Sequence, residues 1–389
     1  MVTRETGPDR RYGLGRSLGP IVEAMLQRGI AARYFCQDAL SNAQLQQRER
    51  FWSRVLRWPG IAGHPARIAM LRAWTERLQV GALAARVARD EHYTHVHAHD
   101  PWIALGVAYG LVGSPTCIRW GVTEHGFGSY AEATRLDGLD QNRFTQRLLR
   151  RIERFVLGRA DWVTAPTVAC LDALARDLAL GTRPAHWHAV PHARPGVAVR
   201  TAASRSAARA QLGWAADDIV VLAVGRLVPL KGFDRIIEAV ASLQMPVLRL
   251  AIVGGGDPAP LQALAQARGI GDRVRFEFVD DMTPWLHGAD IYVSASSTES
   301  FGLANLEALC AGLPCICTPV GGVPEVVGDA AVLVAGDIAS LAQAIGALAR
   351  DAAMRHDRGV GAAARGAAWP DAPDITQRYV DIYQAARQA

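Results

Sequence analysis

The sequence predicts an α/β protein made of two domains, each built around a doubly wound parallel sheet. The chain has 389 residues, which is too long for one ordinary hydrophobic core and favours two domains. Half of the residues are hydrophobic and a fifth are charged, which is a globular composition and excludes a disordered chain. Short apolar runs alternate with helix-length segments, and this alternation is typical of a parallel sheet covered on both faces.

The second half of the chain shows the alternation most clearly. Its strand-like runs are IVVLAV (219–224), LRLAIVG (248–254), VRFEF (274–278), IYVSAS (291–296), PCICT (314–318) and AVLVA (331–335). The helix-length segments between them are FDRIIEAVASL (233–243), PLQALAQAR (260–268), TPWLHGA (283–289) and LANLEALCAG (303–312). The strand-like runs are almost continuously apolar, so we expect their sheet to be buried on both faces.

The first half shows the same alternation in a looser form, with long helices between its strand-like runs. Those runs are THVHAHD (94–100), PTCIRWGVT (115–123), DWVTAP (161–166) and WHAVP (187–191). The opening residues MVTRE look like the tail of a strand whose earlier apolar residues are missing. We expect that translation starts a few codons upstream; the alternative is a short edge strand.

The boundary between the two domains is predicted in the stretch HARPGVAVR (192–200), which is rich in proline and glycine. It divides the chain into a first domain, 1–193, and a second domain, 194–370. The remaining residues, 371–389, include the helical pattern DITQRYVDIYQAARQA, in which two tyrosines and an isoleucine share one side.

The charge is divided unevenly along the chain. The net charge is +5, but residues 1–214 carry +12 and residues 215–389 carry −7. A basic half can bind an anionic partner such as a phospholipid surface, a nucleic acid or a phosphorylated acceptor; the alternative is a solvated arginine-rich face.

Several classes of protein are excluded by what the sequence lacks. No run of 18 or more apolar residues could span a membrane, and the N-terminus has no hydrophobic signal region. The six cysteines form no C-x-x-C pair and lie mostly in apolar runs, which indicates reduced thiols in a cytosolic protein and argues against a zinc site.

One loop concentrates positive charge above the predicted second sheet. In VGRLVPLKG, which follows the strand at 219–224, Arg226 and Lys231 lie five residues apart. Open α/β sheets bind ligands at such strand ends, and two neighbouring cations favour a polyanion such as a diphosphate. Lys231 is the only lysine of the chain, and lysine offers a compact, mobile charge where arginine offers a planar fork. The alternative is chance in an arginine-rich chain.

The strongest motif is SASSTESFGLANLEALCAGLPC (294–315). Glu299 lies in the loop after a strand, and Glu307 lies about one turn into the following helix. The helix start offers backbone N–H groups and a positive dipole end to an anion; the residues there are Ser300, Phe301, Gly302 and Leu303. Two carboxylates on either side of a bound phosphate can accept hydrogen bonds from sugar and ribose hydroxyls. The alternative is an ordinary helix start with acidic residues.

Two glycine-rich loops give weaker signals. VGGGD, with Gly254, allows a ligand to approach the backbone closely, although such a run is most often only a turn. TPVGGVPEVVG (318–328) contains Glu325, for which we expect a structural role.

Together, GRLVPLKG, ESFGLANLEALCAGLP and TPVGGVPEVV resemble the retaining GT-B glycosyltransferases of family 4, the glycosyl transferases group 1 set. The resemblance covers about 150 residues of the second half. It implies two Rossmann-like domains that face each other across a nucleotide-sugar cleft, with a last helix that crosses back to the first domain. It implies that Arg226 and Lys231 contact the donor diphosphate and that Glu307 holds the ribose hydroxyls. It also implies that Glu299 and the amides after it hold the transferred sugar and its phosphate.

The first half resembles the same family less closely. HVHAHDP (95–101) is similar to the family's strand-end histidine motif, and TEHGFG (123–128) is similar to a T-x-H-G loop that puts His125 near the transferred sugar. GLGRS (13–17), with Gly15, stands where the family has a glycine loop near the phosphates, but its glycine pair is split. PHARP (191–195) replaces the family's Pro-Asn-Gly-x-Asp linker, which puts the hinge geometry in doubt.

The sequence predicts chemistry without a metal ion or other cofactor. No D-x-D triplet for a nucleotide-bound metal occurs. His97, His99 and His125 could form a metal cluster, but strand histidines spaced by two usually share a face and end hydrogen-bonded near a loop. Fixed cations and helix N–H groups would then stabilise the charge that grows on the leaving phosphate. The resemblance implies retention of configuration, for which we favour front-side attack over Glu299 as nucleophile.

The acceptor side is less defined. Residues 46–89 interleave three tryptophans with arginines, a pattern that can lie at an anionic membrane surface; the tryptophans are Trp52, Trp58 and Trp74. In the alternative, the tryptophans pack on the sheet and the arginines face water. No nucleic-acid-binding module is present, so no nucleic-acid partner is expected.

The expected function is transfer of a sugar from a UDP- or GDP-sugar to a glycan or lipid-linked acceptor in the synthesis of cell-envelope polysaccharide or lipopolysaccharide. The expected location is the cytoplasm, peripheral to the inner face of the plasma membrane. Two alternatives stay open: a nucleotide-sugar epimerase of the same fold, and a subunit that binds nucleotide sugars without catalysis.

Overall fold

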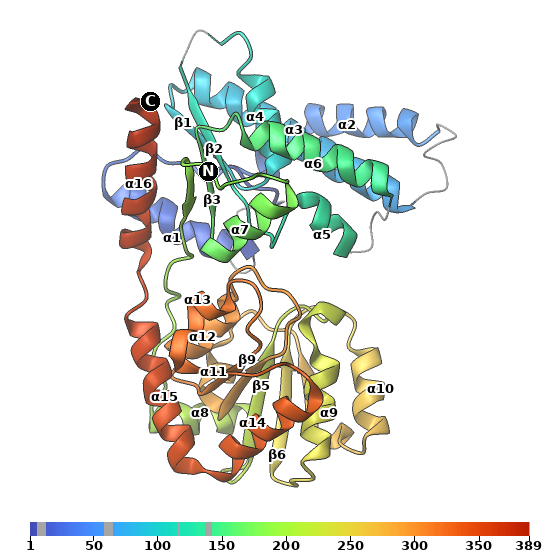
Figure 1. Cartoon of the computed structure of the whole chain (residues 1–389), viewed down its shortest axis with the longest axis vertical. Coiled ribbons are helices and arrows are strands. Elements are labelled where there is room, and N and C mark those ends of the chain that lie inside the picture. Colours follow the sequence, from blue (N-terminus) through green and yellow to red (C-terminus); the bar gives the residue numbers. More distant parts are fainter. Residues whose placement is uncertain (6–12, 58–64, 115–116, 137–141, 389) are drawn as a thin grey trace. The chain divides into compact units, whose positions relative to one another are not determined.

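A computed structural model describes residues 1–5, 13–57, 65–114, 117–136 and 142–388. The chain forms two compact units (Figure 1). The first unit comprises Met1–Ala193 and Ala372–Ala389, and the second comprises Arg194–Asp371.

The second unit is built on a six-stranded sheet whose neighbouring strands all pair in parallel. Its strands are β5 (Ile219–Val224), β6 (Leu248–Val253), β7 (Val274–Glu277), β8 (Ile291–Ser294), β9 (Cys315–Cys317) and β10 (Ala331–Leu333). Their order across the sheet is β10-β9-β8-β5-β6-β7. The predicted parallel sheet is therefore confirmed, with each strand overlapping the apolar run that predicted it.

Helices cover both faces of this sheet. They are α8 (Ala202–Leu212), α9 (Phe233–Ser242), α10 (Ala259–Ala267), α11 (Thr283–Gly288), α12 (Leu303–Cys310), α13 (Val323–Val327), α14 (Ile338–Arg350) and α15 (Ala352–Ala367), with short 3₁₀ turns at Pro229–Lys231, Gly271–Arg273 and Gly328–Ala330. Alternate residues of β5 enter different cores, since Val221 packs with α9 and α14 whereas Leu222 packs with α11 and α12. Burial on both faces explains why the central strands of this sheet are almost continuously apolar.

The first unit contains a four-stranded parallel sheet in the order β1-β2-β3-β4. These strands are β1 (His95–Ala98), β2 (Arg119–Thr123), β3 (Trp162–Ala165) and β4 (Trp187–Ala189). Val2 adds isolated parallel bridges to Phe35 on one side and to Ala98 on the other. The alternative of a short edge strand at the start is therefore wrong, because the segment has a neighbour on each side.

The helices of the first unit are α1 (Gly13–Gln27), α2 (Asn42–Val55), α3 (Pro65–Asp90), α4 (Pro101–Gly110), α5 (Tyr130–Leu136), α6 (Arg143–Leu157), α7 (Val168–Asp177) and α16 (Ala372–Gln388), with a 3₁₀ turn at Gln37–Ala39. The last helix, α16, packs on α1 although almost the whole chain separates them. Their contact contains the buried Ile21 and Met25 of α1 and the buried Ile375 and Tyr379 of α16.

Candidate active site

The second sheet has one position at which the strand order reverses. Strand β5 lies between β6 and β8, so the chain winds outward first on one side of β5 and then on the other. In open α/β sheets, ligands bind at the carboxyl ends of the strands beside such a switch point. The loops that follow β5 and β8 are the two loops that the sequence singled out.

The loop after β5 holds Lys231 at the end of a 3₁₀ turn. Gly232 follows in the left-handed conformation, at φ +65°, and begins α9. The lysine side chain lies against Gly225, where a Cβ atom would be 3.4 Å from its Cε. The Nζ atom of Lys231 forms an ion pair with the Glu299 carboxylate of the loop after β8. Lys231 and Glu299 are therefore brought together across the switch point.

Arg226 lies on the same loop but behaves differently. Its side chain is exposed, and within the described part of the chain its guanidinium group has no hydrogen-bond or ion-pair partner. The two predicted cations therefore lie on one loop, but Lys231 forms an ion pair whereas Arg226 faces solvent.

The loop after β8 leads into α12 through a glycine in the left-handed region. Gly302 has φ +86°, and α12 starts at Leu303 without a side-chain cap. A Cβ atom at position 302 would lie 3.4 Å from Cγ of Glu299, so this carboxylate side chain reaches the start of the helix. The first-turn amides and the positive dipole end of α12 thus lie beside the Lys231–Glu299 pair, an arrangement suited to an anion.

Three further predicted residues support this loop or lie just after it. Phe301 is buried, and its ring meets Trp369 edge to face with centroids 5.6 Å apart. Ser300 precedes it in the loop, and Glu307 is buried one turn into α12. The binding roles of these residues stay predictions.

The glycine run after β6 has a structural reason. A Cβ atom at Gly254 would lie 1.8 Å from the carbonyl oxygen of Gly225, and one at Gly256 would lie 2.8 Å from Cβ of Leu227. The amide of Leu227 donates a hydrogen bond to the carbonyl oxygen of Gly255 at 2.8 Å. The run is therefore needed where the loops after β5 and β6 pack together, and a contact of Gly254 with a ligand stays a prediction.

Sequence reasoning missed two supports of the site. Arg235 of α9 donates hydrogen bonds to the carbonyl oxygens of Ala295, in the loop after β8, and Gly336. Asn305 of α12 accepts a hydrogen bond from the Tyr292 hydroxyl at 2.9 Å, while its buried Nδ2 has no partner within the described residues. The sequence signal that could have identified Asn305 is that it is the single asparagine in the otherwise apolar and acidic stretch LANLEALC.

The first unit brings four histidines together at the carboxyl ends of its strands. The ring centroids of His97 and His99 are 4.5 Å apart, those of His99 and His125 are 5.3 Å apart, and those of His125 and His192 are 5.7 Å apart. Nδ1 of His99 lies 3.1 Å from Nε2 of His125, so one nitrogen donates to the other. Nδ1 of His97 lies 2.7 Å from the hydroxyl of Tyr383 on α16.

Burial keeps these histidines neutral. Desolvation lowers the pKa of His97, His99 and His125 well below the ordinary value of 6.5, and it lowers the pKa of His192 to about 4. Neighbouring rings add to the effect because each would repel a charge on the next. In the part of the chain that the structure describes, no group of three or more His, Cys, Asp or Glu side chains could hold a metal ion.

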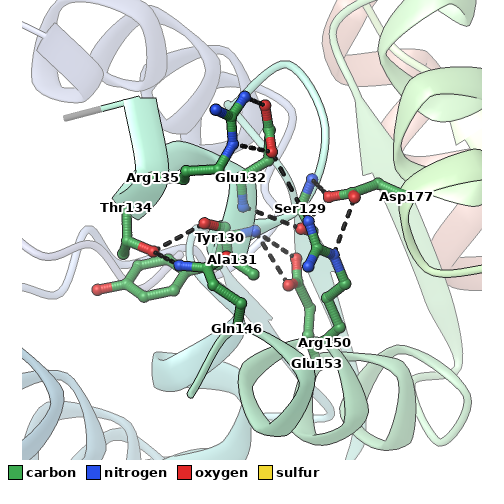
Figure 2. A network of polar contacts seen from close by, with 10 residues as sticks. All are labelled: Ser129, Tyr130, Ala131, Glu132, Thr134, Arg135, Gln146, Arg150, Glu153 and Asp177. Carbon is green, nitrogen blue, oxygen red and sulfur yellow. Dashed lines mark hydrogen bonds and ion pairs between the residues drawn. The ribbon is translucent and has the colours of Figure 1, made fainter. Parts of the chain in front are cut away.

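The loop that carries His125 is fastened to two helices (Figure 2). The amide of Ser129 donates to Asp177 of α7 at 3.1 Å, and its hydroxyl donates to the same carboxylate. The amide of Tyr130 donates to both carboxylate oxygens of Glu153 on α6, at 2.9 and 3.0 Å. Arg150 of α6 pairs with Asp177 at 2.9 Å. This network sets the position of the loop after β2.

Two carboxylates near this loop are held in their protonated form. Burial raises the pKa of Glu153 to about 8, and it raises the pKa of Glu124 well above its ordinary value. Glu153 is only 1% exposed, and Oε1 of Glu124 is buried without a partner among the described residues. A carboxylic acid that stays neutral near neutral pH can donate a hydrogen bond.

Two expectations about local structure in the first unit are wrong, while a contact of Gly15 with the donor phosphates stays a prediction. Gly15 does not lie in a glycine loop: it lies in the first turn of α1, and its amide donates to Glu5 at 3.0 Å. Of the tryptophans that the structure describes, Trp52 and Trp74 do not form a surface stripe, because Trp52 is buried and Trp74 stacks on Trp102 with centroids 4.7 Å apart. Trp58 lies outside the described residues. Within the described residues, no helix is both long and apolar enough to cross a membrane.

Both halves of the chain match known protein families. Residues 204–365 match the family described as glycosyl transferases group 1, and residues 12–193 match the glycosyl transferase 4-like domain.

Similar curated proteins include two that are named D-inositol 3-phosphate glycosyltransferase. The protein from Streptomyces avermitilis is 34% identical over 333 residues, which cover 77% of this chain and 67% of the relative. The protein from Mycobacterium tuberculosis is 34% identical over 345 residues, which cover 80% of this chain and 68% of the relative.

Solved structures agree on the fold. A sucrose-phosphate synthase from Thermosynechococcus elongatus matches with a TM-score of 0.73 and 20% identity, covering 100% of this chain and 98% of the other. Anabaena HepE, solved in complex with UDP and glucose, matches with a TM-score of 0.72 and 18% identity, covering 99% of each chain. At this identity the two structures bear on the fold alone.

Proposed function

The chain is a glycosyltransferase of the GT-B fold and belongs to family 4, and from this premise we propose that it transfers a sugar from a UDP-sugar with retention of configuration and without a metal ion. The main support is the position of Lys231 and Glu299, which meet at the switch point of the second sheet beside the start of α12. The names of structural neighbours solved with UDP and with UDP-glucose support a uridine donor.

The proposed mechanism gives each group of the loop a role. As the sugar leaves, negative charge grows on the β-phosphate, and Lys231 follows this charge as a mobile cation while the amides of α12 stay fixed. Arg226 adds a second cation from its exposed position. Glu299 forms an ion pair with Lys231, so we propose that the donor diphosphate replaces this carboxylate as the partner of the lysine and that Glu299 then turns towards the sugar.

Retention is proposed to follow from front-side attack. The acceptor hydroxyl loses its proton to the departing phosphate oxygen while its oxygen bonds to the anomeric carbon on the face that the phosphate leaves. Glu307, buried on α12, is proposed to hold the ribose hydroxyls, and His125 is proposed to contact the transferred sugar.

For the acceptor we propose a glycan or lipid-linked compound used in envelope polysaccharide synthesis. The name of the curated relatives favours a second candidate, a phosphorylated cyclitol. Both classes include anionic compounds, which suits the net charge of +12 on residues 1–214.

The test begins with thermal shift against UDP-, GDP- and ADP-sugars in the presence of EDTA. We expect a UDP-sugar to raise the melting temperature of the wild type, and to do so far less for Glu307→Gln. The stabilising donor is then incubated with a lipid extract and, separately, with inositol phosphate, and products are read by mass. Donor consumption without an acceptor would favour an epimerase, and donor binding without any product would favour a non-catalytic subunit. Activity that a chelator abolishes and a divalent ion restores would contradict the metal-free mechanism.

A further inference from the structure

Helix α6 of the first unit, labelled in Figure 1, has one face that packs on the unit and an opposite face that is exposed. Its buried residues follow a helical spacing and pack on the unit; they are Gln146, Leu149, Glu153, Val156 and Leu157. The opposite face is exposed along the length of the helix, from Arg143 to Arg159 just beyond its end.

Large apolar side chains occupy the middle of the exposed face. Phe144 is 76% exposed, Phe155 is 53% exposed and Leu148 is 46% exposed. Their spacing of four and seven residues places them on one stripe of the helix. Single exposed apolar residues are common, but three along one stripe indicate a surface that something apolar covers.

Arginines flank this apolar stripe. Five are exposed, and they are Arg143, Arg147, Arg151, Arg154 and Arg159. The only acidic residue of the helix, Glu153, points into the unit. Within the described residues, the four of these arginines that lie inside the helix have no ion-pair partner, and Arg159 lies 4.1 Å over the ring of Phe155. The exposed face therefore has five positive charges and no negative one.

We propose that this face of α6, from Arg143 to Arg159, docks on a membrane surface that contains anionic phospholipid headgroups. A helix in that position buries its aromatic and aliphatic side chains at the boundary of the acyl chains while its arginines bind phosphates. In this position both the apolar stripe and the flanking arginines of α6 contact the membrane.

Two other occupants fit less well. A second copy of the chain across a two-fold axis would bring five arginines against five arginines, which costs several like-charge contacts. A nucleic acid would use the arginines but would gain nothing from the apolar stripe. The inference does not depend on the sugar or on the donor, and it places the membrane contact on α6 rather than on the tryptophans of α2 and α3.

The experiment measures co-sedimentation of the full chain with vesicles. One set contains phosphatidylcholine alone, and the other contains phosphatidylcholine mixed with phosphatidylglycerol. One variant removes charge, as Arg147→Gln with Arg151→Gln and Arg154→Gln; a second removes the apolar stripe, as Phe144→Ser with Phe155→Ser. The matched control is Arg358→Gln with Val360→Ser, which makes the same kinds of change on exposed residues of α15.

We expect the wild type to bind the anionic vesicles in low salt and to leave them in high salt. Removing three arginines should weaken partitioning on the order of 100-fold, at roughly 1 kcal/mol per basic residue. Removing both phenylalanines should weaken it about 10-fold or more, since binding scales with buried apolar area. The control should bind like the wild type.

Three outcomes would overturn the inference. In the first, the wild type fails to bind anionic vesicles. In the second, the charge variant and the apolar variant bind as the control does. In the third, light scattering shows a wild-type dimer that the Phe144/Phe155 variant separates, without vesicle binding, which would assign the face to self-association. Melting curves of all variants confirm that they fold, and donor thermal shift checks that the second unit is intact.

Discussion

Lys231 presents one ammonium group to the Glu299 carboxylate and lays its carbon chain against Gly225. An arginine there has to fit a planar fork into this space, and its charge cannot follow a leaving phosphate as a point charge can. We therefore expect Lys231→Arg to lower kcat about 100- to 1,000-fold, the loss typical when one charge-stabilising donor is removed. Steady-state turnover with the UDP-sugar measures it.

The control for this substitution is the exchange of an exposed cation outside the site. Arg268 pairs with Glu238 on the surface of the second unit, so Arg268→Lys should leave kcat unchanged. Wild-type turnover in Lys231→Arg would show that the positive charge alone suffices and that the shape of lysine has no role.

Glu153 predicts a dependence of stability on pH. Its pKa is raised to about 8 by burial, from an ordinary value of 4.5, so between these values the folded chain holds a proton that the unfolded chain releases. Stability from this group is complete below about pH 4.5 and is lost as the pH rises towards 8. Glu153→Gln keeps a neutral side chain, so its unfolding free energy should gain on the wild type by up to about 1.4 kcal/mol per pH unit in that window.

Urea unfolding at several pH values tests this prediction, with the exposed Glu49→Gln as control. The control should follow the wild type at every pH. A constant difference between Glu153→Gln and the wild type from pH 5 to pH 8 would show that Glu153 is ionised in the fold.

At the residue scale, sequence patterns predicted the side chains that follow strand ends. They missed the polar side chains whose importance depends on being buried. Arg226, Lys231 and Glu299 could be predicted because parallel strands deliver their carboxyl-end loops to one edge of a sheet. The unpartnered Asn305 and Glu124 could not, because burial without a partner depends on packing between distant segments. Gly15 was assigned to a loop because GLGRS stands where the resembling family has its glycine loop, whereas in the structure it lies in the first turn of α1.

At the element scale, the start of α12 depends on Gly302. Its φ of +86° lies in the left-handed region, and a Cβ atom would come 2.5 Å from Nδ2 of Asn305. Gly302→Ala should therefore lower stability by roughly 1–3 kcal/mol and also weaken UDP binding, because it displaces the first-turn amides. Chemical denaturation and calorimetric titration with UDP measure the two effects.

Gly361→Ala is the matched control for this element. Gly361 lies in the exposed part of α15, and a Cβ atom there has no neighbour within 4 Å. The substitution should leave UDP binding unchanged and stabilise the chain by about 0.5–1 kcal/mol, as expected for alanine in place of a helical glycine. Normal UDP affinity in Gly302→Ala would show that the start of α12 does not contribute to UDP binding.

Elements of the second unit could be predicted closely because the strands β5, β6, β8 and β9 are buried on both faces and therefore almost continuously apolar. The helices of residues 42–90 were harder to interpret. Their arginines and tryptophans have a spacing that fits a membrane surface as well as a buried contact, and only the tertiary contact decides. Trp74 stacks on Trp102 of α4, a partner that the spacing of α3 does not reveal.

At the scale of the whole molecule, patterns along the chain predicted two α/β units. They did not predict which unit receives the last helix. The apolar side of α16 could pack on any apolar surface, and its assignment to the first unit in the sequence analysis rested on the family resemblance. In the structure α16 packs on α1, and its Tyr383 hydroxyl reaches His97 beneath the histidine stack.

The membership of α16 in the first unit predicts a local effect of one substitution. Tyr379 is 4% exposed and packs against α1, so Tyr379→Ala should cost about 3–5 kcal/mol of stability, as large-to-small changes at buried aromatic residues do. Hydrogen exchange read by mass should show the loss of protection in peptides from residues 1–193 and 372–389. Peptides from residues 194–371 should keep theirs, because no part of that unit's core includes Tyr379 among the described residues. Ile345→Ala, a buried change in α14, should show the reverse pattern. If Tyr379→Ala instead lowered protection equally in both units, the chain would unfold as one cooperative body and the division into two independently stabilised units would be wrong.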